Sequence, residues 1–178
     1  IENTIEYPAN FTLIGSMNPC PCGNFGSSKK ECKCTPAMIN NYINKLSGPL
    51  MDRIDLHIEV DNVNYSDITS TNTEETSEEI KKRVDEARDI QLKRFSGTKC
   101  YSNAKMNDNQ IKQFCKLDAD SRDLLKEAFD KLSLSARGYV RILKVSRTIA
   151  DLENSENITC DHISEAISYR SLDKKYWG

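Results

Sequence analysis

LSARGYVRILKVSRTIADLE, residues 134–153, is the stretch that best indicates the fold of the C-terminal half of the chain. Ser135 is a residue type that caps helix N-termini, because its side-chain oxygen accepts a hydrogen bond from a backbone N–H of the first turn. Apolar residues then recur at helical spacing, which predicts a long amphipathic helix with one face in a core. The residues expected on that face are Val140, Leu143, Ile149 and Leu152.

Four further segments after residue 76 carry helix signals. Each begins with a residue that favours the N-cap position. The expected caps are Ser77, Asn107, Asp118 and Thr159. In the first of these helices we expect Ile80, Val84 and Ala87 to share the buried face. Together with the helix after Ser135, these segments predict an all-α bundle of about five helices.

The residues before the bundle combine strand and helix signals. Residues 11–16, FTLIGS, form a short apolar run typical of a buried strand, and residues 55–60, DLHIEV, alternate as a strand does. Between them, residues 36–46 show apolar side chains at i, i+3, i+4 and i+7, with Pro36 at the start. The sequence therefore predicts an α/β fragment ahead of the helical bundle.

The chain is expected to divide at a polar, acidic stretch. Residues 61–79, DNVNYSDITSTNTEETSEE, contain few residues that build a core. We therefore assign residues 1–62 to the α/β part, 63–76 to a linker and 77–178 to a helical domain.

Composition narrows the class of protein. Hydrophobic residues make up 38% and charged residues 29%, with a formal net charge of −2, which excludes a disordered or a generally basic nucleic-acid-coating chain. No apolar run approaches the roughly 18 residues that span a bilayer, and the start lacks the features of a signal peptide. We expect a cytoplasmic protein with no membrane partner. Because the chain begins with Ile and soon reaches a strand-like segment, we also expect it to be part of a longer protein.

The cysteine pattern predicts a metal site. The chain has seven cysteines, an odd number, and three of them stand singly, which argues against a secreted disulfide framework. The other four form two C-x-C pairs separated by nine residues, and their thiolates suit a structural Zn²⁺ with no open position for catalysis. Free thiols and a disulfide-forming switch are the alternatives. The candidate ligands are Cys20, Cys22, Cys32 and Cys34.

Several catalytic motifs are absent from the sequence. It contains no G-x-x-x-x-G-K-[ST] phosphate-binding loop, no G-x-G-x-x-G fingerprint and no H-E-x-x-H. The two histidines, His57 and His162, have no nucleophile motif beside them.

Four motifs in a fixed order carry a resemblance to a known family. They are MNPCPCG (17–23), CKCTP (32–36), LSGPLMDRIDLHIEV (46–60) and LSARGYVRILKVSRTIADL (134–152). With them the chain resembles the C-terminal part of the magnesium-chelatase-like AAA+ ATPases of the ComM-type competence family, over roughly residues 5–172. The fold implied is the C-terminal strands of an AAA+ P-loop core followed by a helical lid. The departures from the family pattern are Met51, Gly138 and Ser146.

The resemblance implies three nucleotide-contacting residues. Asn18 matches sensor 1, where an amide donates to the γ-phosphate and accepts from the attacking water. Arg53 matches the arginine finger, which reaches the nucleotide of a neighbouring subunit with a permanently charged planar fork. Arg137 matches sensor 2 in the first turn of a lid helix.

Each of these residues has an alternative. A turn cap before Pro19 is the alternative for Asn18, and an ion pair with Asp52 or Asp55 is the alternative for Arg53. Arg141 and Arg147 compete with Arg137 for the sensor 2 role.

The resemblance also implies the activity of a longer protein. It would be a hexameric ring of identical subunits that uses ATP and Mg²⁺ to move on DNA, driving branch migration during natural transformation. Residues 1–8 would be the returning strand of a hairpin directed at the pore. Because the phosphate-binding loop and the acidic magnesium-binding strand are missing, we expect this chain alone not to hydrolyse ATP. The rival functions are the motor subunit of a metal-inserting chelatase and a non-enzymatic zinc-binding interaction module.

Overall fold

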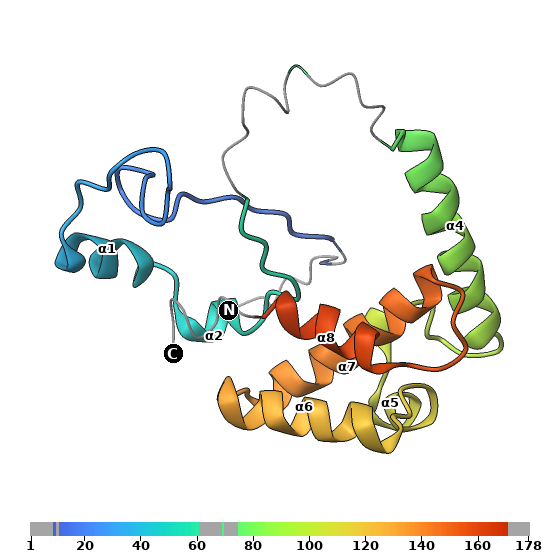
Figure 1. Ribbon diagram of the computed structural model, residues 1–178. Helices are drawn as coiled ribbons and strands as arrows, with labels where there is room; N and C mark the ends of the chain where they lie inside the picture. The colour runs from blue at the N-terminus through green and yellow to red at the C-terminus, as the bar shows by residue number, and fades with distance from the viewer. Residues whose placement is uncertain (1–8, 10, 61–68, 70–74, 171–178) are drawn as a thin grey trace, which may run out of the picture. The chain divides into compact units, whose positions relative to one another are not determined.

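A computed structural model describes residues 9, 11–60, 69 and 75–170. The chain separates into two compact units, residues 1–45 and residues 46–178. Each unit is described by itself, and Figure 1 shows the elements of both.

The first unit contains an extended segment, a loop with four cysteines and one helix. α1 (Pro36–Ile43) begins after Thr35, whose Oγ1 accepts a hydrogen bond from the N–H of Met38 at 3.3 Å. Pro36 fits the first helical position because proline lacks a backbone N–H, and an N–H at this position would have no partner within the helix. Among the described residues of this unit, Cys20 and Ile43 are buried.

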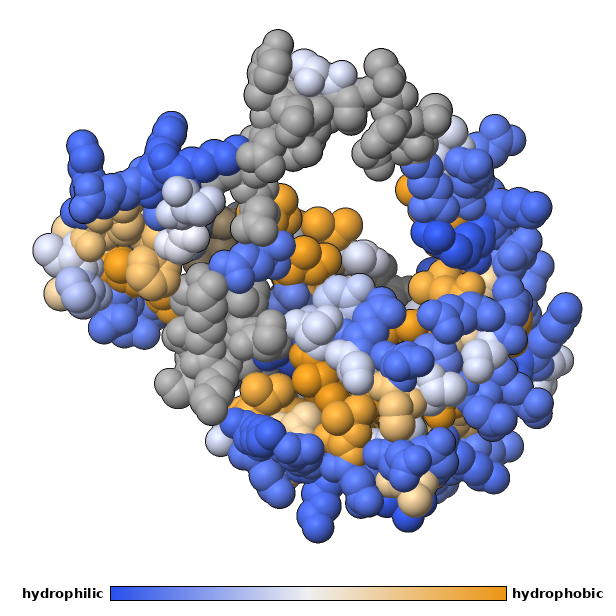
Figure 2. All heavy atoms as spheres, viewed as in Figure 1, coloured by the Kyte–Doolittle hydropathy of each residue, from blue (hydrophilic) through white to orange (hydrophobic). Residues whose placement is uncertain are grey.

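The second unit is helical in most of its described residues. Its elements are α2 (Gly48–Met51), α4 (Ser77–Arg94), η1 (Asn103–Lys105), α5 (Asp108–Phe114), α6 (Ala119–Lys131), α7 (Ala136–Leu152) and α8 (Cys160–Ser168). Hydrophilic residues cover most of the surface of α4 and α6 that Figure 2 shows, although α4 also exposes the apolar side chains of Ile80, Val84 and Leu92.

α7 is the central helix of the second unit. It packs against α4, η1, α5 and α8, and α8 packs in turn against α6 (Figure 1). Leu143 and Ile149 are buried as predicted, whereas Val140 and Leu152 are half-buried. The buried hydrophobic core joins all of these helices. Its members are Phe95, Met106, Ile111, Cys115, Leu125, Leu134, Ile142, Leu143, Ile149, Ala150, Ile158, Ile163 and Ala166.

Helix starts follow local capping chemistry. The side chains of Asn107, Asp118 and Ser135 accept the predicted N-terminal hydrogen bonds of α5, α6 and α7. α4 differs from the prediction because Thr76, not Ser77, is its cap. Thr76 has Glu79 three residues later, and the two side chains form a reciprocal capping box.

Two helices end on residues with a left-handed backbone. Ser133 follows α6 with φ 50°, and Asn154 follows α7 with φ 55°. In each case the next N–H donates back into the helix, Leu134 to the carbonyl of Phe129 and Ser155 to that of Ala150. These are Schellman ends, which satisfy carbonyls that the helix leaves without partners.

A polar network is buried where α4, η1 and α7 meet. Asp151 is 1% exposed, and its carboxylate accepts from the guanidinium groups of Arg94 and Arg147 and from the amide of Asn103. Asn103 also donates to the hydroxyl of Thr148 at 3.1 Å. The network joins three elements through one carboxylate.

The predicted fold class, an α/β fragment followed by an all-α bundle, is wrong for the described part of the chain, which contains no strand. Residues 11–16 and 55–60 are extended but form no ladder, and their apolar side chains are exposed, with Ile14 at 89% and Val60 at 86%. A strand exists only when a neighbouring strand pairs its backbone groups. The apolar patterns of these segments indicate an extended backbone but do not supply the partner.

Some predictions fall outside the described residues. These are the returning strand at 1–8, most of the linker at 63–76 and the end of the helical domain after residue 170. Within the described ranges, no helix has the length and apolar character needed to cross a membrane.

Candidate metal centre and nucleotide-contacting residues

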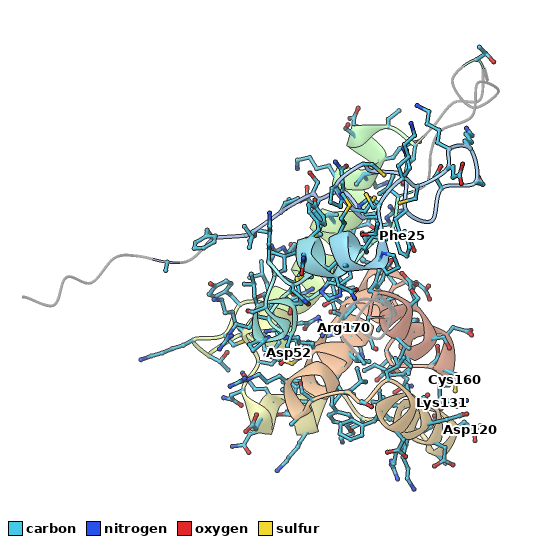
Figure 3. All side chains as sticks on the ribbon, turned by 90° about the vertical axis from the view of Figure 1, so that its left-hand side faces the viewer. Phe25, Asp52, Asp120, Lys131, Cys160 and Arg170 are labelled. Atoms are coloured by element: carbon cyan, nitrogen blue, oxygen red, sulfur yellow. The ribbon has the colours of Figure 1, made fainter. Side chains whose placement is uncertain are left out.

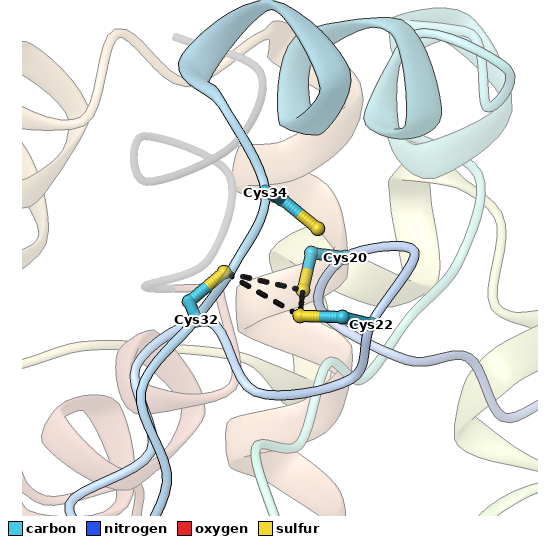
Figure 4. A group of neighbouring side chains, drawn as sticks. All are labelled: Cys20, Cys22, Cys32 and Cys34. Atoms are coloured by element: carbon cyan, nitrogen blue, oxygen red, sulfur yellow. Dashed lines mark hydrogen bonds between the residues drawn. The ribbon is translucent and has the colours of Figure 1, made fainter.

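The loop after Asn18 brings four cysteine sulfur atoms together. A turn closed by the N–H of Gly23 on the carbonyl of Cys20, at 3.0 Å, reverses the chain after the first C-x-C pair. Gly23 and Gly26 have φ of 77° and 79°, a region that side chains disfavour, which explains a glycine at each turn. Figure 4 shows the four side chains directed toward a common centre.

The spacing of the sulfur atoms fits a tetrahedral zinc site. The Sγ atoms of Cys20, Cys22 and Cys32 are 3.4, 3.7 and 3.6 Å apart, and all four Sγ atoms lie within 4.8 Å of one another. A tetrahedron with Zn–S bonds of about 2.3 Å has edges of about 3.8 Å. No disulfide joins these cysteines. The donor set and its geometry therefore suit a structural Zn²⁺ held by Cys20, Cys22, Cys32 and Cys34.

The four thiols do not have equal acidity. Hydrogen bonds from the backbone at Asn24 and Lys33 lower the pKa of Cys22 to about 6, because they stabilise the thiolate. Desolvation, together with hydrogen bonds with the sulfurs of Cys22 and Cys20, raises the pKa of Cys34 to about 12. At neutral pH the metal-free cluster thus has a thiolate at Cys22 and a thiol at Cys34, so metal binding must displace at least one proton.

Asn18 lies at the entrance to the cysteine loop. It is exposed, and together with Ser16, Met17 and Tyr42 it lines a shallow open pocket. The alternative role of Asn18 as a turn cap has no support here, because its side chain makes no hydrogen bond to another described residue. The sensor 1 role of Asn18 stays a prediction.

Arg53 is exposed just after α2. Its Nη1 donates to the carbonyl of Pro49 at 2.9 Å, and the guanidinium forms no ion pair with any residue that the structure describes. The neighbouring acids have other partners, since Asp52 accepts from the hydroxyl of Ser135 at 2.9 Å and Asp55 pairs with Arg141. The alternative of an ion pair with Asp52 or Asp55 is therefore not what the structure contains.

The three candidate arginines of α7 have different surroundings. Arg137 is exposed in the first turn and makes no hydrogen bond or ion pair with the described residues. Arg141 is paired with Asp55. Arg147 is 3% exposed and contacts Asp151 and the carbonyls of Ser155 and Glu156. Of the three, Arg137 is the one that is exposed and makes no hydrogen bond or ion pair with a described residue, which favours it for sensor 2.

The two histidines have structural surroundings. Nδ1 of His162 accepts from the N–H of Thr159 at 3.0 Å and so completes the cap of α8, while Nε2 contacts Glu153 at 2.8 Å. His57 is buried, and its backbone N–H donates to the carbonyl of Tyr169 at 2.9 Å.

One residue near Arg53 has no signal in the sequence. Arg170, just beyond α8, is 2% exposed and donates to the carbonyl of Ile54, 116 residues earlier in the chain. Sequence patterns act over a few residues, so only the folded chain reveals this contact.

Comparison with known proteins identifies the family. Residues 1–68 match the family described as magnesium chelatase, subunit ChlI, and residues 74–170 match its counterpart described as magnesium chelatase, subunit ChlI C-terminal. The chain belongs to this magnesium-chelatase-like AAA+ family.

Individual proteins are also similar to the chain over most of its length. The chain is 40% identical to competence protein ComM of Haemophilus influenzae over 169 residues, which is 94% of this chain and 32% of the relative. It is also 40% identical to the YifB protein of Escherichia coli K12 over 171 residues, 96% of this chain and 33% of the relative. A Mycobacterium tuberculosis protein is 31% identical over 164 residues, covering 92% and 32%. The chain thus spans about a third of the length of these curated relatives.

Proposed function

We propose that the chain is the nucleotide-sensing and lid portion of a ring-forming AAA+ ATPase. The observation that carries this proposal is the state of Arg53, which is exposed while the two acids beside it are engaged elsewhere. A finger must keep its guanidinium available for the transferred phosphoryl group of another subunit. In the same unit, exposed Arg137 is suited to the sensor 2 role. Asn18, which belongs to the other unit, is proposed as sensor 1.

In this proposal the chain provides only part of the ATPase. The phosphate-binding loop and the acidic magnesium-binding residues are expected in other parts of a longer protein, because this sequence contains neither motif. ATP and Mg²⁺ are thus the cofactors of the longer protein, and identical subunits in a hexameric ring are its partners. The chain alone is expected to be inactive.

The longer protein is proposed to be a cytoplasmic DNA motor. Support comes from the resemblance to the ComM-type family and from the 40% identity to a protein named for competence. Stimulation of the ATPase by branched or single-stranded DNA distinguishes this role from a chelatase motor and from a non-enzymatic module.

The cysteine loop is proposed to be a structural zinc site next to sensor 1. The four sulfur atoms lie close enough to bind one ion, and four thiolates leave no position for a substrate. Metal analysis of protein purified without chelator is expected to find about one zinc per chain. Less than about a tenth of an equivalent would rule out stoichiometric binding.

The experiment that tests the nucleotide-contacting assignment is steady-state ATPase of the longer protein with Arg53→Ala. Loss of a finger is expected to lower kcat by about 10³-fold or more. Arg83→Ala is the matched control, because Arg83 is exposed and pairs only with Glu75 on the surface. Unchanged kcat in the Arg53→Ala ring would refute the proposal.

A further inference from the structure

The segment that carries Arg53 is attached to the helical bundle at several points. Asp52 accepts from Ser135, the cap of α7, at 2.9 Å. Asp55 pairs with Arg141, six residues further along the same helix. The N–H of His57 donates to the carbonyl of Tyr169 at the end of α8, at 2.9 Å. These contacts hold residues 52–57, which we call the finger segment, against the ends of two helices.

Arg170 holds the finger segment from both sides of Arg53. Its Nη1 donates to the carbonyl of Ile54 at 2.5 Å, and its Nη2 lies 3.6 Å from a carboxylate oxygen of Asp52. Asp52 and Arg170 are labelled in Figure 3. The two contacted residues are the immediate neighbours of Arg53, Ile54 through its backbone carbonyl and Asp52 through its carboxylate, so one guanidinium contacts the chain on both sides of Arg53.

An arginine suits this position for physical reasons. Its planar fork directs several N–H groups at fixed angles, so one side chain can reach a carbonyl and a carboxylate together. The Arg170 side chain is 2% exposed, and the Asp52 side chain is 25% exposed. Water therefore competes little for the donors of Arg170, and the contact can hold its geometry.

We propose that Arg170 is a positioning residue for Arg53, an inference that rests on the proposed function of Arg53 as a finger. Arg170 does not touch nucleotide in this account. It acts by holding the residues on either side of Arg53 in place. Asp52 also accepts a hydrogen bond from Ser135, the cap of α7. The finger segment is therefore attached to the helix that contains Arg137. A movement of the lid that follows nucleotide bound at Arg137 would then move the finger offered to the neighbouring subunit.

The attachment itself is testable on this chain by amide hydrogen exchange. Arg170→Lys keeps the charge but replaces the fork by a single ammonium, which cannot maintain both contacts. The amide of His57 is expected to exchange about tenfold faster or more, while that of Ala150 inside α7 is unchanged. Arg122→Lys is the matched control. Arg122 lies on α6, away from the finger segment, and makes an exposed contact with the carbonyl of Leu117 in the loop before that helix. Exchange at His57 that stays within about twofold of wild type would overturn the inference.

A second variant covers failure of Arg170→Lys to fold, which circular dichroism would reveal. Asp52→Asn leaves the buried arginine in place and removes the charge of its partner. The expected result is exchange at His57 about threefold faster or more. An unchanged rate in this variant would likewise overturn the attachment.

The catalytic consequence is tested in the longer protein. Arg170→Lys is expected to lower kcat for ATP hydrolysis by about tenfold or more and to leave KM within about twofold, since Arg170 makes no contact with the substrate. Combined with Arg53→Ala it is expected to add no further loss, because both changes act through the same guanidinium. Additive losses would overturn the positioning role.

The failure of this inference and the failure of the proposed function give different results. Unchanged kcat in Arg53→Ala removes the finger and with it the positioning role. If Arg53→Ala loses activity as expected but the His57 amide exchanges at an unchanged rate in Arg170→Lys, the finger role stands and only the positioning role of Arg170 is overturned.

Discussion

Replacing Asp151 by Asn is expected to lower the free energy of unfolding of the helical unit by about 3–5 kcal/mol. The carboxylate is buried and lies between two arginines. Oδ2 accepts from Nη1 of Arg94 and from Nδ2 of Asn103, both at 2.7 Å, and Oδ1 accepts from Nε of Arg147 at 3.1 Å. Asn offers one acceptor oxygen and turns an NH₂ group toward the remaining donors. The buried guanidinium of Arg147 and the half-buried guanidinium of Arg94 then lose their counter-charge.

The burial of Arg147 explains why the loss in the free energy of unfolding is expected to be large. Burial lowers the pKa of Arg147, and the charge of Asp151 opposes that effect. The carboxylate therefore stabilises the buried cation. Domains of this size have a total stability of about 5–15 kcal/mol, so a loss of 3–5 kcal/mol removes a large part of it.

Urea unfolding followed by far-UV circular dichroism measures the loss. Glu127→Gln is the matched control, because Glu127 and Lys131 form an exposed pair on α6 with 59% and 71% of their side chains accessible. Such an exposed pair contributes little to the free energy of unfolding, because water screens the two charges. If Asp151→Asn cost less than about 1 kcal/mol, or no more than the control, the buried network would not stabilise the unit as argued.

Three further predictions concern the cysteine loop and a helix end. In metal-free protein at pH 7, iodoacetamide is expected to modify Cys22, whose pKa is lowered to about 6, well before Cys34, whose pKa is raised to about 12; equal rates by mass spectrometry would contradict this. Zinc affinity is expected to rise at least about tenfold between pH 6.5 and 7.5, because Cys34 must lose its proton to bind; a chelator competition that gives a flat profile would refute it. Ser133→Gly is expected to raise the unfolding free energy by about 0.5–1 kcal/mol by relieving a φ of 50°, and a destabilised variant would contradict that reason.

Local features of the helices were predictable from the sequence. Asn107, Asp118 and Ser135 cap the helices that follow them because a cap depends on only a few residues. The prediction for α4 failed in detail. Ser77 and Thr76 are both capping types, and the choice depended on the partner three residues later, Glu79.

The buried faces were predicted less well, because they depend on where other helices pack. Ile80 and Val84 share a face with Ala87, yet they are 41% and 42% exposed while Ala87 is 4% exposed. α4 is therefore covered only in its second half. Helical spacing indicates which residues share a face but does not show how far along the helix the neighbours extend.

The strand predictions were wrong, and the attachment of the finger segment could not be predicted, for a common physical reason. Both depend on contacts between residues far apart in the chain. Residues 11–16 and 55–60 have the composition of strands, but pairing requires a neighbour that composition does not reveal. Arg170 and Ile54 lie 116 residues apart, and neither shows a local sign of the other.

The candidate site was predictable where the chemistry is concentrated in one short stretch. The four cysteines lie within fifteen residues of one another, and the loop between the pairs folds back to bring their sulfur atoms together. The sequence already favoured Arg137 among the three arginines of α7, and the structure adds that Arg147 is buried and Arg141 is paired, which only packing shows.

The most direct test of the central claim is ATPase complementation between two inactive forms of the longer protein. In the proposed function, Asn18→Ala is expected to disable the site of its own subunit, whereas Arg53→Ala is expected to disable the site of the neighbouring subunit. In a ring of heterologous interfaces mixed at equal amounts, about a quarter of the sites combine an intact Asn18 with an intact Arg53 from the next subunit. We predict recovery of up to about that fraction of wild-type activity. A mixture no more active than the mean of the two variants would contradict the account.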